Sequence, residues 1–290
     1  MNLASSSSPS LARRIISPLP FLAIHVATVL VLWRLGWSWR GFGIAVAAYY
    51  VRMFFVTGGY HRYFSHRTYR TSRAFQLVLA VFAQTSFQKG ALWWAAHHRV
   101  HHKLSDQPGD PHSMMREGFW RSHVGWILDP RNDVTDLKRI SDLARFPELV
   151  WLNEWWWVPP ALWAVASYLI GGMFGLLWAT GVSTVLLWHG TFTINSITHW
   201  MGKPRYVSGD FSKNSFWLAL VTMGEGWHNN HHYYQRSTNQ GFFWWEIDPT
   251  YYVLRLLQAL GVIWDIHVAP ERVKHSNRID ATLVEERRLA

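Results

Sequence analysis

Histidine is the residue type in this chain whose number and spacing point to chemistry. Sixteen histidines are present, and eight of them fall into three short groups, two of which share the pattern His-x-x-His-His. On a helix, residues three or four apart share one face, so each such pattern can aim several imidazoles at a common point. The groups are His61 and His66; His98, His101 and His102; and His228, His231 and His232.

The first group is spaced differently. His61 and His66 are five residues apart, which does not place them on one face of an α-helix. We expect them where a membrane helix ends and loosens, at the cytosolic surface. A metal site is preferred over a pH-sensing patch, because eight close imidazoles without a metal would repel each other when protonated and leave lone pairs unused when neutral.

A ninth candidate ligand is His199, with Asn195 one helical turn earlier on the same face. Glu225 and Asp106 lie beside the third and second groups, where they could accept the second N–H of a ligating imidazole. Nine histidines exceed the four to six ligands of one ion, so two ions are predicted, and zinc, copper and iron all remain open. The other histidines are expected to be structural hydrogen-bonding groups: His25, His97, His112, His123, His189, His267 and His275.

Composition indicates which elements must position these residues. The chain of 290 residues is 49% hydrophobic, has 20 tryptophans and is only 16% charged, which favours an integral membrane protein over an aromatic-rich soluble core. Cysteine is absent, so disulfides and thiolate-ligated metals are excluded. The net charge of +10 indicates a surface facing anionic lipid or a phosphate-bearing substrate, and no motif for nucleic acid is present.

Apolar runs predict four membrane spans, of which the second is interrupted by Arg52, a charge that must face the protein interior or reach the surface. Lys and Arg number 13 in the segment 58–154 and 10 in 203–290, against two in the first hairpin loop and none in the second. Both long segments should therefore be cytosolic, with the histidines. The apolar stretch 74–92 is expected to lie on or dip into the membrane, because a crossing would separate the histidine groups. The predicted spans are 15–35, 41–60, 155–172 and 174–198, between a disordered tail (1–14) and a C-terminal tail (266–290).

Longer motifs surround these histidines. Their sequences are Gly-Gly-Tyr-His-Arg-Tyr-Phe-Ser-His at 58–66, His-Arg-Val-His-His-Lys at 98–103, Asp-Pro-His at 110–112, Ser-His-Val-Gly-Trp at 122–126, Asn-Ser-Ile-Thr-His at 195–199 and Gly-Glu-Gly-Trp-His-Asn-Asn-His-His at 224–232. In these motifs the chain resembles the membrane-bound fatty acyl desaturases of the stearoyl-CoA desaturase type, especially bacterial and cyanobacterial members. The resemblance runs from about the first span to Ile263, the domain being assigned to 15–265.

The resemblance implies an all-α integral membrane fold with a cytosolic helical cap that holds the dimetal site. It implies two iron ions bound by the nine histidines, with Asn195 holding a water on one of them. The reaction would use O2 to place a cis double bond, delta-9 by analogy, in a saturated acyl chain. Zinc has no redox chemistry and could not do this. A bacterial cytoplasmic membrane is the expected location.

Four residues are candidates for contacting the substrate. Tyr49 and Met53, one turn apart on the second span, could limit chain length, and helix packing is an equal alternative for both. Arg99 and Trp94 are candidates for contacting the head group. Leu128-Asp129-Pro130-Arg131 stands where the animal enzymes would have a basic pair, and Phe242 to Asp248 resembles the cyanobacterial acyl-lipid enzymes, so the carrier remains open between acyl-CoA, acyl-lipid and a carrier protein.

The reaction consumes two electrons, yet the chain has no dinucleotide fingerprint and no thiolates for an iron–sulfur cluster. A separate donor is expected, such as a ferredoxin or a cytochrome b5-type protein with its reductase, docking on the basic cytosolic surface. Two rival functions remain. One is a membrane fatty acid or alkane hydroxylase with the same ligands, and the other is a non-catalytic membrane metal-binding protein.

Overall fold

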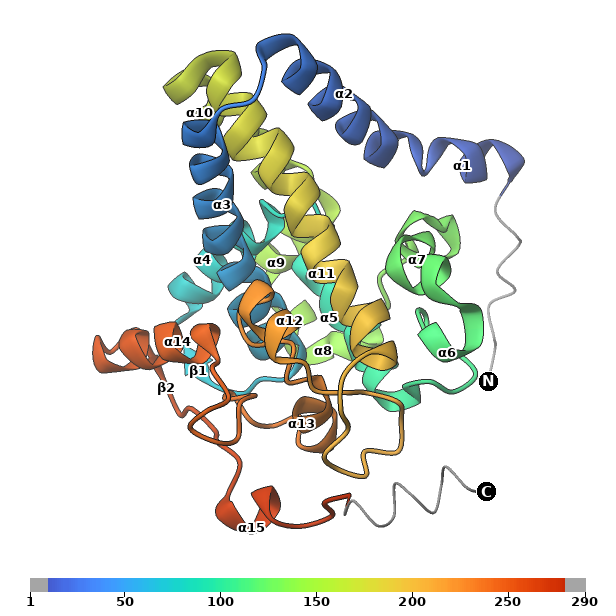
Figure 1. Ribbon diagram of the computed structural model, residues 1–290, viewed down its shortest axis with the longest axis vertical. Coiled ribbons are helices and arrows are strands. Elements are labelled where there is room, and N and C mark those ends of the chain that lie inside the picture. Colours follow the sequence, from blue (N-terminus) through green and yellow to red (C-terminus); the bar gives the residue numbers. More distant parts are fainter. Residues whose placement is uncertain (1–9, 280–290) are drawn as a thin grey trace.

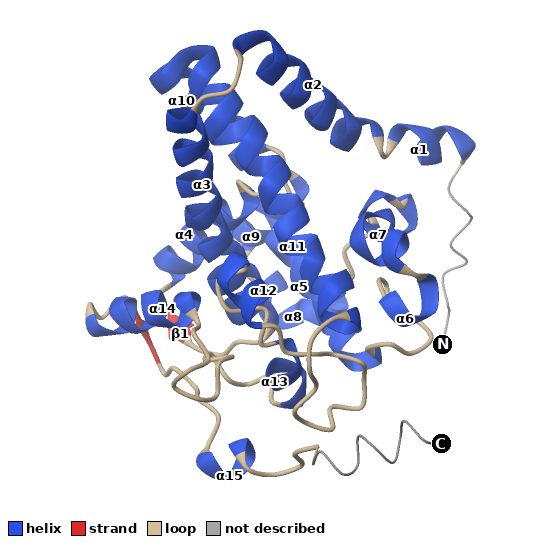
Figure 2. Ribbon diagram, in the orientation of Figure 1, coloured by secondary structure: helices blue, strands red, loops and turns tan. Residues whose placement is uncertain are grey.

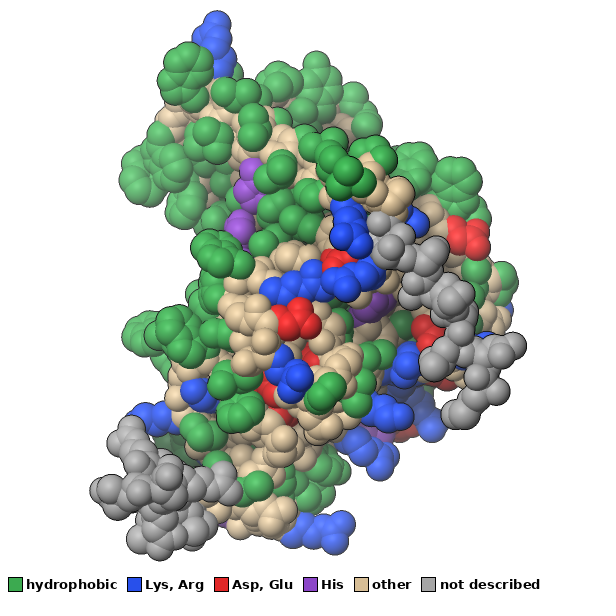
Figure 3. Space-filling view, turned by 90° about the vertical axis from the view of Figure 1, so that its right-hand side faces the viewer, with side chains coloured by type: hydrophobic (Ala, Val, Ile, Leu, Met, Phe, Trp, Pro, Cys, Tyr) green, Lys and Arg blue, Asp and Glu red, His purple; other side chains and the backbone are tan. Residues whose placement is uncertain are grey.

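The computed structural model describes residues 10–279, and these residues are almost entirely helical. Three helical stretches are long and apolar enough to cross a membrane: Leu11–Leu35, Trp39–Ser65 and Val158–Trp200. They stand in the upper part of the molecule, above a set of shorter helices (Figures 1 and 2). On the face in Figure 3, hydrophobic side chains dominate the upper part and charged side chains gather lower down. The chain is therefore a membrane protein.

The first stretch contains α1 (Leu11–Ile16) and α2 (Leu19–Leu35), which leans away from the other long helices in Figure 1. No side chain of α1 or α2 is buried. The tail expected over 1–14 lies outside the described residues up to residue 9, and the chain is helical from Leu11. The predicted start of the first span, at residue 15, therefore falls within the short helix α1.

The second stretch joins α3 (Trp39–Phe54) to a π-helix, η1 (Phe55–Ser65). Its tight packing on the third stretch depends on small residues, since a Cβ on Gly41 would lie 2.2 Å from the Trp178 ring. Arg52, the one charge inside the predicted second span, is fully buried. It donates to the Thr85 carbonyl and to Thr184 Oγ1 at 3.0 and 2.9 Å, tying three segments together.

The third stretch contains α10 (Val158–Gly175), the π-helix η5 (Leu176–Val182) and α11 (Ser183–Trp200). Gly172 leaves the helical region, with φ 58° and ψ −150°, and the chain reverses there. Trp163 Nε1 donates to the Ala179 carbonyl at 3.0 Å across the two arms, as Thr180 Oγ1 does to Ser167 Oγ, also at 3.0 Å. The reversal falls within the predicted turn at Gly171 and Gly172.

Short helices and loops form the lower part. Helix α4 (Arg73–Gln84), within the stretch expected not to cross, has 12 residues, fewer than the roughly 20 that a crossing needs. A two-stranded antiparallel sheet, β1 (Arg70–Thr71) with β2 (Ile263–Trp264), ties this region to the C-terminal part. The remaining α-helices are α5 (Ala91–Leu104), α6 (Met114–Glu117), α7 (Trp126–Leu128), α8 (Ser141–Ala144), α9 (Pro147–Glu154), α12 (Phe216–Val221), α13 (His228–Tyr233), α14 (Pro249–Ala259) and α15 (Glu271–Lys274).

Three short segments complete the helical elements: the π-helical turn η2 (Arg121–Gly125) and the 3-10 turns η3 (Pro130–Asn132) and η4 (Leu137–Ile140). The largest buried cluster packs η1 against α4 and α5, through side chains such as Tyr60, Phe64, Leu79 and Leu92. This core lies directly beside the histidines, so the packing that stabilises the lower part also fixes their positions.

Candidate metal centre

The nine predicted histidines come together in two neighbouring groups. Within each group the ligand nitrogens lie within 4.8 Å of one another. A five-histidine group contains His61, His66, His98, His102 and His231, and a four-histidine group contains His101, His199, His228 and His232. The His-x-x-His-His patterns on α5 and α13 each supply histidines to both groups, so the groups share their supporting helices.

The π-helix explains how His61 and His66 meet. In η1 the hydrogen bonds span five residues, and the His66 N–H donates to the His61 carbonyl at 3.2 Å. A spacing of five, which would separate these side chains on an α-helix, brings their ring centroids to 4.8 Å here. The helix widens at the end of the membrane stretch, where the sequence predicted that it loosens.

The imidazoles face one another through their Nε2 atoms. His61 Nε2 lies 3.0 Å from His231 Nε2, and His231 Nε2 lies 3.0 Å from His102 Nε2. In the other group, His199 Nε2 is 3.0 Å from His228 Nε2. The His232 Nε2 atom is buried without a hydrogen-bond partner. Mutual hydrogen bonds cannot satisfy all of these converging nitrogens, whereas a cation at the centre of each group would.

Burial keeps these imidazoles neutral. Desolvation first, and then repulsion between neighbouring imidazoles, lowers the pKa values of His98, His102, His228 and His231 well below the ordinary 6.5. Burial lowers the pKa of His232 to about 4, although the adjacent Asp210 opposes this shift. At neutral pH the lone pairs are therefore free to bind metal.

Four carboxylates accept the outer N–H of four of the histidines. Two of them are the predicted ones: His199 Nδ1 donates to Asp106 at 2.8 Å and His61 Nδ1 to Glu225 at 2.5 Å. Two were not predicted: His101 Nδ1 donates to Asp110 at 3.0 Å and His232 Nδ1 to Asp210 at 2.5 Å. Such partners fix the tautomer and the orientation of an imidazole that binds metal.

These carboxylates are held as anions. Burial alone would raise their pKa values, but the hydrogen bonds from the histidines outweigh it for Asp106 and Asp110. Hydrogen bonds from His232 and Ser212 do the same for the pKa of Asp210, and the charge of Arg62 and the hydrogen bond from His61 do so for that of Glu225. Three of these four anions, Asp106, Asp110 and Asp210, lie beside the four-histidine group.

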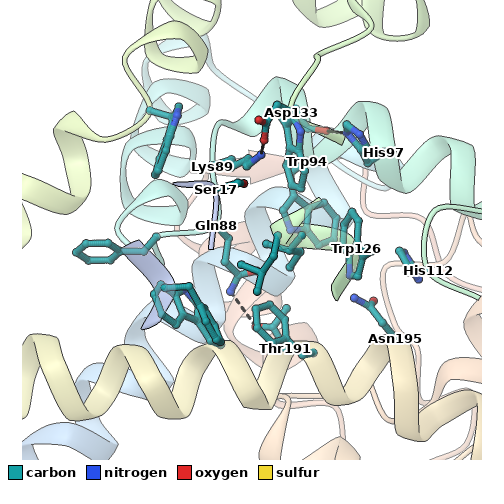
Figure 4. A pocket seen from close by; sticks show the side chains of 18 of the residues that line it. Ser17, Gln88, Lys89, Trp94, His97, His112, Trp126, Asp133, Thr191 and Asn195 are labelled. Atoms are coloured by element: carbon teal, nitrogen blue, oxygen red, sulfur yellow. Dashed lines mark hydrogen bonds and ion pairs between the residues drawn. The ribbon is translucent and has the colours of Figure 1, made fainter. Parts of the chain in front are cut away.

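Figure 4 shows an apolar cavity of about 240 Å³ beside the histidines. His98, a member of the five-histidine group, is one of its lining residues. The cavity walls come from α2, α5, α7 and α11 and include the predicted residues Trp94 and Asn195. Gln88 Nε2 donates to Thr191 Oγ1 at 3.0 Å across the cavity wall. Lys89 and Asp133, an ion pair, lie at a separate polar end.

The other predicted substrate residues lie outside this cavity. Tyr49 and Met53 are buried and pack on α11, where a Cβ on Gly190 would lie 2.5 Å from Tyr49 Oη. Tyr49 Oη donates to the Val221 carbonyl at 2.7 Å. Arg99 donates to Asp142 at 2.7 Å and lines a polar pocket with His66, His102, Lys103 and Arg236.

The histidines expected to be structural make contacts of their own. His189 joins two others through its two nitrogens: Nε2 lies 3.2 Å from His25 Nε2, and Nδ1 lies 3.0 Å from His123 Nε2. His97 Nδ1 lies 3.0 Å from the Trp93 carbonyl. His112 stacks on His101 with centroids 4.2 Å apart, so it belongs to the surroundings of the four-histidine group.

Comparison with known proteins identifies the family of this chain. The family model described as fatty acid desaturase matches residues 37–264. The chain is 33% identical over 275 residues to an sn-1 stearoyl-lipid 9-desaturase of Anabaena variabilis, covering 94% of this chain and 100% of that protein. It is 35% identical to an sn-2 palmitoyl-lipid 9-desaturase of Nostoc sp., covering 91% and 93% of the two chains.

An acyl-CoA 5-desaturase of Anemone leveillei is also 35% identical, with 81% of this chain and 74% of that protein covered. The chain belongs to the fatty acid desaturase family. It is therefore a membrane oxidoreductase that acts on fatty acyl chains.

Proposed function

We propose that this protein is an O2-dependent desaturase that introduces a cis double bond, at delta-9, into a saturated acyl chain with two iron ions and external electrons. The observation that carries the proposal is the pair of histidine groups beside an apolar cavity. The ligands would be the nine histidines of the two groups. Iron fits this nitrogen-only donor set, and when bound it supplies the oxidising chemistry that removes two hydrogens from unactivated methylenes.

The residues around the ions would position them and the substrate. Asp106 and Glu225 orient ligating imidazoles, and Asp110 and Asp210 do the same for two others. The apolar cavity would hold the acyl chain against His98, away from bulk water. Asn195 lines that cavity, where its amide would hold a water near one metal.

The chain would cross the membrane four times and carry the centre on the cytosolic side. Two observations support this topology: the reversal at Gly172 within the third apolar stretch, and the excess of Lys and Arg in the segments that carry the histidines. The two arms of that stretch would form the third and fourth spans. The short helices beneath them would then be the cytosolic cap.

The acyl chain would arrive on a glycerolipid or on CoA, since the relatives include both an acyl-lipid desaturase and an acyl-CoA desaturase. Trp94 lies in the cavity wall, as a contact with the substrate requires. Tyr49 and Met53 lie outside this cavity, so they would limit chain length indirectly, by positioning α11, which lines it. Arg99, in the polar pocket beside His66 and His102, would contact the head group of the substrate. Lys103 and Arg236 in the same pocket would belong to a basic surface for an acidic ferredoxin or cytochrome b5-type donor.

Expression in a host, followed by lipid mass spectrometry with double-bond location, tests the proposal. A new monounsaturated acyl chain is expected, and His101→Ala should abolish it. His275→Ala is the matched control, because His275 is solvent-exposed and lies outside both groups. A hydroxylated product would identify the rival hydroxylase. A product that persists in His101→Ala would refute the assigned centre.

A further inference from the structure

The surroundings of the two histidine groups differ in charge. In the four-histidine group three of the four imidazoles donate to a carboxylate: His101 to Asp110, His199 to Asp106 and His232 to Asp210. In the five-histidine group only His61 does so, to Glu225. All four carboxylates are at least 94% buried, so solvent screens them little.

The single carboxylate of the five-histidine group is also compensated. Arg62, fully enclosed, donates to Glu225 at 3.1 Å and to Asp248 at 3.0 Å. A basic pocket containing Arg99, Lys103 and Arg236 opens on the same group. The charge of Glu225 is therefore offset by Arg62, which Asp248 shares. Lys103 and Arg236 lie at the opening beside the group, where Arg99 is itself paired with Asp142.

The three carboxylates of the other group have no such compensation. Within residues 10–279, neither Asp106, Asp110 nor Asp210 has a Lys or Arg nitrogen within 4.0 Å. Their remaining partners are neutral donors. Ser113 Oγ donates to Asp106 at 2.8 Å, and Ser208 Oγ donates to Asp210 at 2.8 Å. Hydroxyl groups orient these anions without cancelling their charge.

The two groups also differ in how accessible they are from outside the protein, and the five-histidine group is the more accessible. His98 lines the apolar cavity, and His66 and His102 line the basic pocket, so the five-histidine group meets two openings. None of the four histidines of the other group lines either opening. Their side chains are at most 3% exposed where paired with a carboxylate.

From these contacts we infer that the two metal sites are unequal: the four-histidine site holds a divalent cation more tightly, and the five-histidine site is the exchangeable one. A fifth neutral imidazole adds a ligand but no charge. An anionic hydrogen-bond partner to a ligating histidine typically changes metal affinity by about 10–100-fold. The four-histidine site has three carboxylate partners without a neighbouring cation, and the five-histidine site has one carboxylate that Arg62 compensates. This difference in charge should affect metal affinity more than the one additional imidazole of the five-histidine site does. Asp106, Asp110 and Asp210 act as positioning residues in this arrangement.

Zn²⁺, which binds imidazole and has no redox chemistry, is a suitable probe. The purified full chain is loaded with Zn²⁺, and the metal retained per chain is measured against increasing chelator. We expect release in two steps, one metal each, separated by about tenfold or more. His231→Ala should remove the weaker step and His228→Ala the tighter one, since neither residue has a carboxylate partner.

Isosteric changes then test the electrostatic cause. Asp210→Asn should weaken the tighter step by about 10–100-fold and leave the weaker step in place, while Glu225→Gln should act only on the weaker step. If Asp210→Asn does not fold, Ser208→Ala removes one donor to that carboxylate and should shift the same step by less. Thermal unfolding of each apo variant reports folding independently.

Three results would overturn the inference: a single release step, a tighter step that survives His228→Ala, or an Asp210→Asn variant that shifts the weaker step. A wild-type chain that retains no Zn²⁺ would overturn it too. The inference rests on the proposed dimetal centre but not on turnover. Two unequal sites in a chain that leaves host lipids unchanged would sustain it while removing the desaturase assignment.

Discussion

The buried ion network around Arg62 makes a quantitative prediction about stability. Arg62 and its two partners, Glu225 and Asp248, are each at most 2% exposed, so each charge depends on the others. Arg62→Met leaves two carboxylates without their cation. Breaking a buried ion pair from one side costs about 3–5 kcal/mol, which in a chain of this size lowers the unfolding temperature by on the order of 10 °C.

Thermal unfolding of the apo protein in detergent measures this effect. Arg70→Met is the control, because the Arg70 and Asp265 side chains are 75% and 53% exposed and such a pair contributes about 1 kcal/mol or less. Arg62→Lys keeps a charge in place and should lose less than Arg62→Met.

The pH dependence gives a second check. Without Arg62 the pKa values of Glu225 and Asp248 rise in the folded state. A group whose pKa is raised on folding contributes stability at low pH and loses it as pH rises. The deficit of Arg62→Met relative to wild type should therefore be larger at pH 7 than near pH 4.5. Equal unfolding temperatures for Arg62→Met and Arg70→Met would refute the reasoning.

Three further predictions concern the cluster histidines and the packing on α11. Burial lowers the pKa values of the cluster histidines, so protons bind more readily to the unfolded chain below pH 6.5. The free energy of unfolding of the apo protein should therefore be highest above pH 6.5 and fall by on the order of 1 kcal/mol per histidine per pH unit below it. An apo unfolding temperature that rises on acidification would contradict this. Gly190→Leu should cost about 1–3 kcal/mol by overlapping Tyr49, and Tyr49→Ala in the same chain should recover part of it in a double-mutant cycle. Tyr49→Ala should shift products toward longer acyl chains while Tyr50→Ala, at a more exposed neighbouring side chain, should not; unchanged chain selectivity would remove Tyr49 from that role.

The sequence predicted the helical elements well because their signals are local. Uncharged runs marked the apolar stretches, and Gly171-Gly172 marked the reversal. The spacing of four residues places His98 with His102, and His228 with His232, in one group. The pairs three residues apart, which the same reasoning put at a common point, are divided between the two groups. The five-residue spacing of His61 and His66 was correctly assigned to a loosened helix end, although the pattern did not specify a π-helix.

The parts of the site that the sequence did not predict depend on contacts between residues far apart in the chain. Asp210 lies 22 residues before His232, in an irregular segment, and no local pattern connects them. Asp110 stands in the Asp-Pro-His motif, which marked it as part of a site without indicating its partner His101. The cavity was expected from the family, but its lining, with Tyr49 and Met53 outside it, depends on how α2 and α11 pack.

Helix α2 forms one wall of the cavity but supplies no histidine to either metal-binding group. It contributes Pro20, Phe21 and Ile24 to the lining, yet none of its side chains is buried. In lipid, apolar side chains gain little from packing on another helix, so α2 is held chiefly by specific contacts such as the stacking of Phe21 on Trp188, with centroids 5.0 Å apart. A tilt of α2 would change the width of the cavity while leaving every histidine of the two groups in place.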